Sequence, residues 1–173
     1  MDQTNIGLQS VVKALIDTIA PAIDPSDHLA KEQLRLAASY VDFIRQRLHL
    51  IHARERYDLR HYVALANEIL AAGMPGDATS MVTLRSTLAT AVPIVSDPAA
   101  LTDEIRSTAL ELAHAVAAAV QEAHRAHPNC SQRVDMAVLA ATEDKLELER
   151  LWYQPVGFDP SPRRGRSLEE CLK

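Results

Sequence analysis

Three polar side chains lie on an otherwise apolar helical stripe, and they are the first candidates for chemistry in this sequence. His52, Glu55 and Tyr62 recur at helical spacing. A carboxylate buried there must be hydrogen-bonded or paired, because an isolated charge is expensive to bury. One interpretation is an inward polar pocket that binds a small polar ligand or transfers a proton. The favoured interpretation is structural: the stripe meets solvent at a bend near Tyr57, or a buried network fixes the helix register.

A second set of residues approaches the ligand pattern of metal sites in helical bundles. Those sites use two Glu-x-x-His pairs together with carboxylates from other helices. Glu111 and His114 match the pair, and Asp58 and His61 match it loosely. If Ile105 marks the centre of the buried face, Glu111 and His114 lie roughly 120° and 180° away, toward solvent. We therefore expect no metal and no other cofactor, and we interpret these pairs as solvated.

Three further side chains of the types that bind zinc lie at the predicted end of a helix. They are His124, His127 and Cys130. A structural zinc site normally has four protein ligands, and this cluster lacks the fourth. Histidines also stabilise the negative end of a helix dipole. The dipole interpretation is favoured, so the cluster predicts a helix terminus.

Several arginines make one region of the chain basic, although the protein as a whole is acidic. They are Arg45, Arg47, Arg54, Arg56 and Arg60. On a helical wheel they do not share one face, which argues against a stripe that binds phosphate groups. Their scatter predicts separate salt bridges with acidic residues of adjacent helices. A second basic run, Arg163–Arg166, is too short to indicate a role.

Composition excludes several classes of protein. The chain has 173 residues, a mass of 19.0 kDa, 5 glycines and 2 phenylalanines, which disfavours an all-β sandwich or barrel. A net charge of −5 disfavours binding to nucleic acid. The sequence contains no glycine-rich phosphate loop and no Gly-x-Ser-x-Gly elbow, and no residue set identifies a catalytic reaction. Cys130 and Cys171 do not form a Cys-x-x-Cys pair, and neither a secretion signal nor a membrane span is apparent, so we expect a cytoplasmic protein.

Proline and glycine divide the chain into five segments with helical periodicity. The segments are residues 6–19, 26–72, 79–92, 97–123 and 131–153. The apolar spacing of the third fits a strand as well as a helix, and a helix is favoured because a lone strand would leave its backbone unpaired. The fourth has seven alanines among residues 109–123, which allows neighbouring helices to approach closely and predicts a central position.

The segment 26–72 carries more apolar surface than one neighbouring helix would cover. It has no proline or glycine, so we expect one very long helix or two helices with a break near Arg56–Asp58. Apolar residues follow one stripe from Ala30 to Ile69. A second strip beside it consists of Leu29, Leu36, Tyr40, Phe43 and Leu50. Two-fold self-association would bury this second strip.

These patterns predict an all-α, antiparallel up-and-down helical bundle of five to six helices, one of them very long or bent. We expect residues 1–153 to form one domain and residues 154–173 an irregular, proline-rich tail. This tail drapes over the bundle through Val156, Phe158 and Leu168, crosses to another subunit, or is disordered. The expected function is protein interaction without nucleic acid or membrane, most simply as a homodimer or as an accessory subunit. The alternative is a bundle enzyme or binding protein with a polar or metal site between helices.

Overall fold

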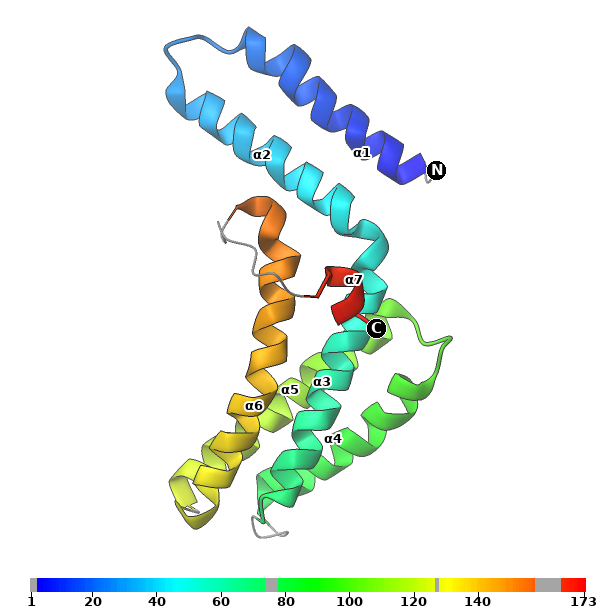
Figure 1. The fold of residues 1–173 in the computed structure, drawn as a ribbon, viewed down its shortest axis with the longest axis vertical. Helices are drawn as coiled ribbons and strands as arrows, with labels where there is room; N and C mark the ends of the chain where they lie inside the picture. Colours follow the sequence, from blue (N-terminus) through cyan, green and yellow to red (C-terminus); the bar gives the residue numbers. More distant parts are fainter. Residues whose placement is uncertain (1–2, 74–77, 127, 158–165) are drawn as a thin grey trace. The chain divides into compact units, whose positions relative to one another are not determined.

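The computed structural model describes residues 3–73, 78–126, 128–157 and 166–173, except for the side chains of residues 126–129. Every regular element in these ranges is a helix, and no described residue lies in a strand, which confirms the all-α class. The α-helices are α1 (Gln3–Ala14), α2 (His28–Arg47), α3 (Ile51–Ala71), α4 (Thr79–Ser96), α5 (Thr102–Ala126), α6 (Pro128–Tyr153) and α7 (Leu168–Cys171) (Figure 1). The chain packs as two compact units: Met1–Leu50 with Trp152–Gly165, and Ile51–Leu151 with Arg166–Lys173.

The N-terminal unit is built on a hairpin in which α1 and α2 lie side by side (Figure 1). A π-helical turn, Leu15–Ile19, and a 3-10 turn, Ala20–Ala22, lead out of α1. The cap expected before the second segment is present, because the Asp27 carboxylate accepts a hydrogen bond from the amide of Ala30 at 2.9 Å. This hairpin buries little: α1 has no buried residue, and α2 buries only Ala38 and Phe43.

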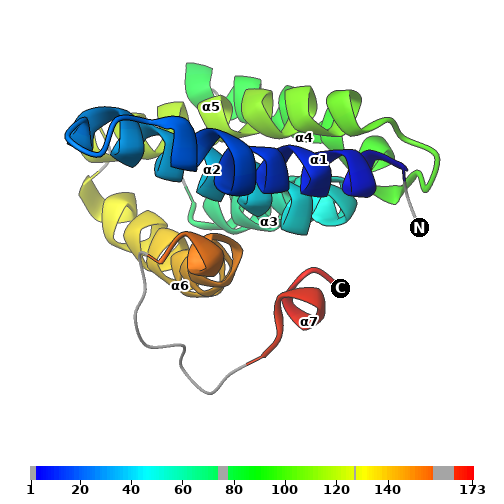
Figure 2. The same ribbon diagram turned by 90° about the horizontal axis from the view of Figure 1, so that it is seen from above.

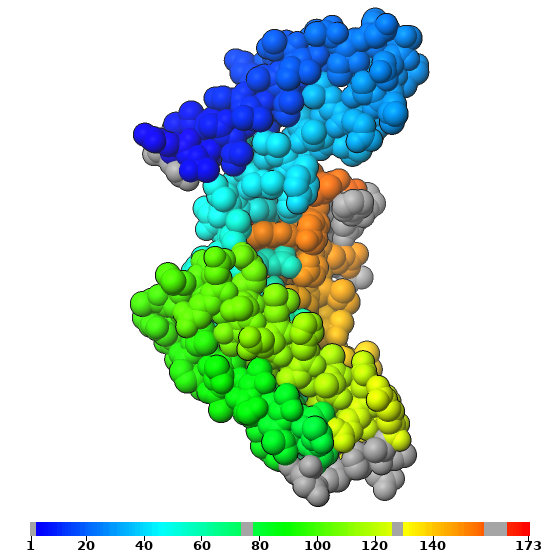
Figure 3. Space-filling view, turned by 180° about the vertical axis from the view of Figure 1, so that it is seen from behind, coloured from blue at the N-terminus to red at the C-terminus, as the bar shows by residue number. Residues whose placement is uncertain are grey.

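The second unit has a continuous hydrophobic core formed mainly by α3, α4 and α5. These three helices pack against one another (Figure 2). Helix α5 packs against both α3 and α4, as its alanine content predicted. Figure 3 shows α4 and α5 side by side on the face seen from behind. The largest fully buried side chains of the core are Leu59, Ile69, Met81, Leu84, Ile105, Leu112 and Val134. Burial of side chains of this kind stabilises the fold by about 1.5–3 kcal/mol each.

Three predicted helix boundaries are wrong. The break in the second segment is a 3-10 turn at Leu48–Leu50, ahead of the expected Arg56–Asp58, and neither proline nor glycine marks it. Helix α4 runs through Pro93 to Ser96; the proline is exposed and one turn from the end, so few intrahelical hydrogen bonds are lost. Helix α5 starts at Thr102, because Asp97 ends α4 and uses its carboxylate to accept a hydrogen bond from the amide of Ala99 at 2.8 Å.

The tail region contains two short helical elements in its described part. A 3-10 turn spans Gln154–Val156, and α7 follows the eight residues that the structure does not describe. Of the three expected anchors, Leu168 is buried, Val156 is exposed, and Phe158 lies outside the described residues. Arg163 and Arg164 also lie outside them. None of the described helices combines the length and the apolar character needed to cross a bilayer.

Candidate functional site

The polar residues of the predicted pocket contact other parts of the second unit. His52 is exposed, and its Nδ1 lies 2.9 Å from the hydroxyl of Thr102, the first residue of α5. Glu55 is half-buried and accepts a hydrogen bond from the Arg106 guanidinium at 2.8 Å. This ion pair raises the pKa of Arg106. His52 and Glu55 therefore link the beginnings of α3 and α5.

Tyr62, the third residue of the predicted pocket, belongs to a different neighbourhood. It packs against the hydrophobic core, and its ring meets the edge of His61 with 5.1 Å between centroids and an interplanar angle of 76°. The three residues share one helix but have different partners. A ligand-binding role for His52, Glu55 and Tyr62 remains a prediction.

The metal-ligand candidates are separated by their environments. Asp58 forms an ion pair with Lys145 of α6 and lies 3.7 Å from Arg54. His61 is half-buried and stacks on Tyr57 with an interplanar angle of 12°. Glu111 and His114 are exposed, as their offset from Ile105 predicted. Among the described residues, no three His, Cys, Asp or Glu side chains are grouped closely enough to hold a metal ion.

The predicted helix-terminus cluster is also divided among separate partners. His124 Nε2 lies 2.9 Å from a carboxylate oxygen of Asp135, which joins α5 to α6. The Cys130 thiol donates to the carbonyl oxygen of Gly73 at 3.4 Å. His127 lies outside the described residues.

An ionic cluster joins α3 to α6, and apart from Arg54 its members were not identified as ion-pair partners from the sequence. Arg54 and Asp58 come from α3, and Lys145 and Glu149 come from α6. Arg54 of α3 pairs with Glu149 of α6. Asp58, one turn later in α3, pairs with Lys145, one turn earlier in α6. The two helices therefore run in opposite directions. All four side chains are partly buried, with 13–30% of each exposed, and ion pairs in such surroundings are screened less than pairs on an open surface.

Burial shifts the pKa of two side chains that lie beside the ionic cluster. Burial, reinforced by the positive charge of Lys145, lowers the pKa of His61 from its usual 6.5. Burial also raises the pKa of Tyr57, with contributions from the negative charges of Asp144 and Asp58. Both effects favour the neutral form, so the pair supplies little charge of its own near neutral pH.

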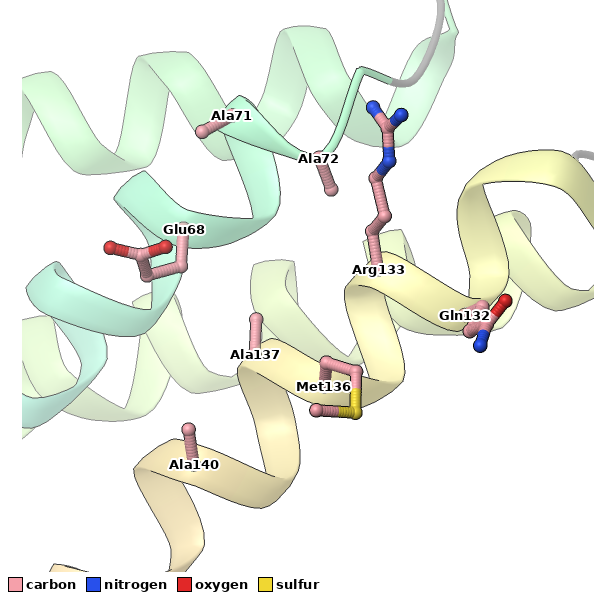
Figure 4. A pocket seen from close by; sticks show the side chains of 8 residues that line it. All are labelled: Glu68, Ala71, Ala72, Gln132, Arg133, Met136, Ala137 and Ala140. Atoms are coloured by element: carbon pink, nitrogen blue, oxygen red, sulfur yellow. The ribbon is translucent and has the colours of Figure 1, made fainter.

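Further along the same two helices lies an open groove of about 550 Å³ (Figure 4). Its apolar lining comes from Ala71, Ala72, Met136, Ala137 and Ala140, and its polar lining from Glu68, Gln132 and Arg133. The lining therefore offers mainly small apolar side chains, together with one carboxylate and one guanidinium group.

Three of the arginines expected to form salt bridges donate to backbone oxygens, and the first of them, Arg47, donates to the carbonyl oxygen of Trp152 at 3.0 Å. Arg56 donates to the carbonyl oxygens of Asp97 and Val95, both at 2.8 Å, at the end of α4. Arg60 donates to the backbone oxygens of Leu172 and Lys173 at 2.9 and 2.8 Å. The predicted salt bridge to an adjacent helix occurs at Arg54, whereas Arg45 pairs with Asp42 of its own helix. The prediction of acidic partners is therefore wrong for Arg56 and Arg60, because carbonyl groups at helix ends lack intrahelical donors and compete for guanidinium groups.

Most of the second apolar strip, on α2 of the N-terminal unit, is exposed to solvent. Leu29, Leu36 and Tyr40 are 71%, 47% and 62% exposed. Phe43, further along the strip, is buried, with its ring 5.7 Å from the stacked ring of Tyr153. The strip is thus covered at Phe43, where the Tyr153 ring stacks on it, and exposed at Leu29, Leu36 and Tyr40.

The comparisons with known proteins place this chain in no family. No protein-family model matches it, and neither a curated protein nor a solved structure does.

Proposed function

We propose that this chain is a non-enzymatic interaction protein that forms a homodimer through the exposed strip of α2. The observation that carries the proposal is the exposure of Leu29, Leu36 and Tyr40 on one helix face. Contiguous apolar surface of this kind marks protein interaction sites. The same exposure would be unfavourable in an isolated chain.

The exposed strip lies on the side of α2 opposite to α1. Ala38 is buried, and Arg45 donates to the Asn5 side chain of α1 at 3.3 Å, so these two residues mark the covered face. At 100° per residue, the strip is centred roughly 170° from them. Helix α1 therefore leaves the strip open to a second partner.

The N-terminal unit also needs more buried surface than its own helices provide. Helix α1 has no buried residue, and α1 and the π-helical turn after it expose Ile6, Val11, Ile16 and Ile19 by more than two fifths. A small unit that buries so little apolar area gains little stability from its own packing. A second hairpin would supply the missing partner surface.

A second copy fits the strip in an antiparallel arrangement. With α2 paired to its copy about a point between Leu36 and Tyr40, each Leu36 meets the Tyr40 of the other chain. The residues flanking this centre are Ala37 and Ser39, which are small and uncharged. In this register Glu32 lies opposite Ile44 of the other copy, so its carboxylate meets no like charge.

The same proposal includes an antiparallel, up-and-down order of helices α3 to α6. What supports it is the short length of the connections, with α4 ending at Ser96 and α5 starting at Thr102, and α5 ending at Ala126 and α6 starting at Pro128. We further place the protein in the cytoplasm. The free thiols of Cys130 and Cys171 support a reducing compartment.

Substitution within the strip tests the dimer. We expect the double variant Leu36→Glu with Tyr40→Glu to have half the wild-type mass in light scattering after size exclusion, because two like charges would be buried opposite their copies. The helix content by circular dichroism should be unchanged, since both positions are exposed within the chain.

A matched control uses an exposed leucine outside the strip. Leu110→Glu changes a side chain of α5 that is 56% exposed, and it should leave the mass at the wild-type value. Equal masses for the strip variant and the wild type would contradict the proposed interface.

A further inference from the structure

The C-terminal segment Arg166–Lys173 is ordered by its own sequence. Ser167 caps α7: its hydroxyl accepts a hydrogen bond from the Glu170 amide at 3.2 Å, and the Glu170 carboxylate accepts one from the Ser167 amide at 2.6 Å. These hydrogen bonds lower the pKa of Glu170, which keeps its carboxylate ionised. The segment therefore carries the start signal of a short helix without help from neighbouring elements.

One face of this short helix is buried. Leu168, Cys171 and Leu172 are each less than one tenth exposed, whereas Glu169 and Glu170 on the other side are exposed. A helix of four residues cannot bury three side chains by itself, and helices this short are not stable in isolation. Their burial must come from the second unit, to which the segment belongs.

Polar contacts hold both ends of the segment to that unit. At its end, the Arg60 guanidinium of α3 donates to the backbone oxygens of Leu172 and Lys173. At its beginning, Arg166 lies 4.0 Å from the Glu147 carboxylate of α6 and donates to the Cys171 sulfur at 3.6 Å. The receiving surface thus supplies polar partners at both ends of the segment and covers its apolar side chains. We name this surface, marked by Arg60 and Glu147, the segment site.

We propose that the segment site is a binding site for a short amphipathic helix and that it takes Arg166–Lys173 from a second copy as well as from its own chain. Leu168, Cys171 and Leu172 occupy positions i, i+3 and i+4, the spacing by which grooves recognise amphipathic helices. Every contact given above comes from residues 166–173, so recognition does not depend on the covalent connection. Eight residues separate Gly157 from Arg166, a tether of at most about 28 Å. This inference does not depend on the α2 interface of the proposed function.

The test supplies the segment on a separate molecule. The probe is a fluorescently labelled peptide with the sequence of residues 166–173, and the receptor is the full chain carrying Leu168→Asp and Leu172→Asp, which frees the site. Fluorescence anisotropy should give this variant at least tenfold tighter binding than the wild-type chain, because a tethered segment competes at an effective concentration in the millimolar range. Equal binding by the two chains, or binding by neither, would overturn the proposal.

Two controls separate recognition from loss of folding. Helix content by circular dichroism must match the wild type; if the Asp variant fails this check, Leu168→Ser with Leu172→Ser frees the site without adding charge. A peptide with the same two leucines replaced by aspartate should not bind, and its binding would count against the proposal.

Arg60 provides the specific readout. Added to the freed receptor, Arg60→Gln should weaken peptide binding at least tenfold, because it removes the donors to Leu172 and Lys173. Arg35→Gln, on the exposed surface of α2, is the matched control and should leave binding unchanged. Equal effects of the two substitutions would show that Arg60 does not recognise the peptide, which would contradict the proposed segment site. The α2 dimer is judged separately by the mass of the Leu168→Asp, Leu172→Asp chain, which cannot exchange its segment, so either idea can fail alone.

Discussion

Lys145 is the residue on which the ionic cluster between α3 and α6 most depends. Its ammonium group contacts Asp58 and lies 3.4 Å from Glu149. Lys145→Met leaves two partly buried carboxylates with Arg54 as their shared cationic neighbour. We expect the free energy of unfolding in urea to fall by about 1 kcal/mol, in the upper range for partly exposed pairs. Lys13→Met, at an exposed position of α1, should change it by less than about 0.5 kcal/mol.

His61 makes the stability of the protein depend on pH. Its pKa in the folded protein is below 6.5, so the unfolded chain takes up the proton more readily. The stability from the neutral imidazole is complete above pH 6.5 and is lost as pH falls from 6.5 through the lower folded pKa. Urea unfolding from pH 7.5 to 5 should show this loss in the wild type and a smaller loss in His61→Gln. Identical pH profiles would show that His61 does not contribute.

At the residue scale, sequence reasoning identified the polar positions better than it identified their partners. The exposure of Glu111 and His114 followed from helical phase alone. The contacts of Arg56 and Arg60 could not be predicted, because the backbone oxygens that they bind belong to residues distant in the sequence. The pairing of Lys145 with Asp58 was hidden for the same reason.

At the scale of the element, Gly73 determines how α3 ends. Its φ of +85° lies in the left-handed region, which a residue with a Cβ atom adopts only with strain. Gly73→Ala should lower the free energy of unfolding by about 1 kcal/mol. A steric clash is not the cause of this loss of stability, since an added Cβ would lie 3.6 Å from the Arg133 side chain, which is an ordinary van der Waals contact.

Gly7 is the matched control for this substitution. It lies within α1, and a Cβ there would meet nothing within 4 Å. Gly7→Ala should therefore stabilise the chain by about 0.5–1 kcal/mol, because alanine has the higher helix propensity. If thermal or urea unfolding gave the two glycines effects of the same sign, the backbone argument at Gly73 would be wrong.

Most elements could be predicted from the sequence, but several of their ends could not. Helical spacing and the Asp27 cap located α2, and the choice of helix for residues 79–92 is confirmed by α4. The break at Leu48–Leu50 contains no residue that disfavours a helix, so local propensity did not mark it. Pro93 disfavours a helix interior, yet it lies close enough to the end of α4 to be accommodated.

At the scale of the whole molecule, the division into two compact units was not apparent from periodicity. The stripe from Ala30 to Ile69 runs across the boundary at Leu50 without a change in spacing. Periodicity reports which side of a helix is apolar, and it does not report which element covers that side. It did identify the excess apolar strip on α2, whose first part is exposed in the structure.

The mass of the wild-type chain in solution tests the central claim most directly. Sedimentation equilibrium over a micromolar concentration range should give twice the 19.0 kDa of one chain, with dissociation only on dilution. A mass of 19.0 kDa at every concentration would contradict the claim, because the strip formed by Leu29, Leu36 and Tyr40 would then face water in the functional protein.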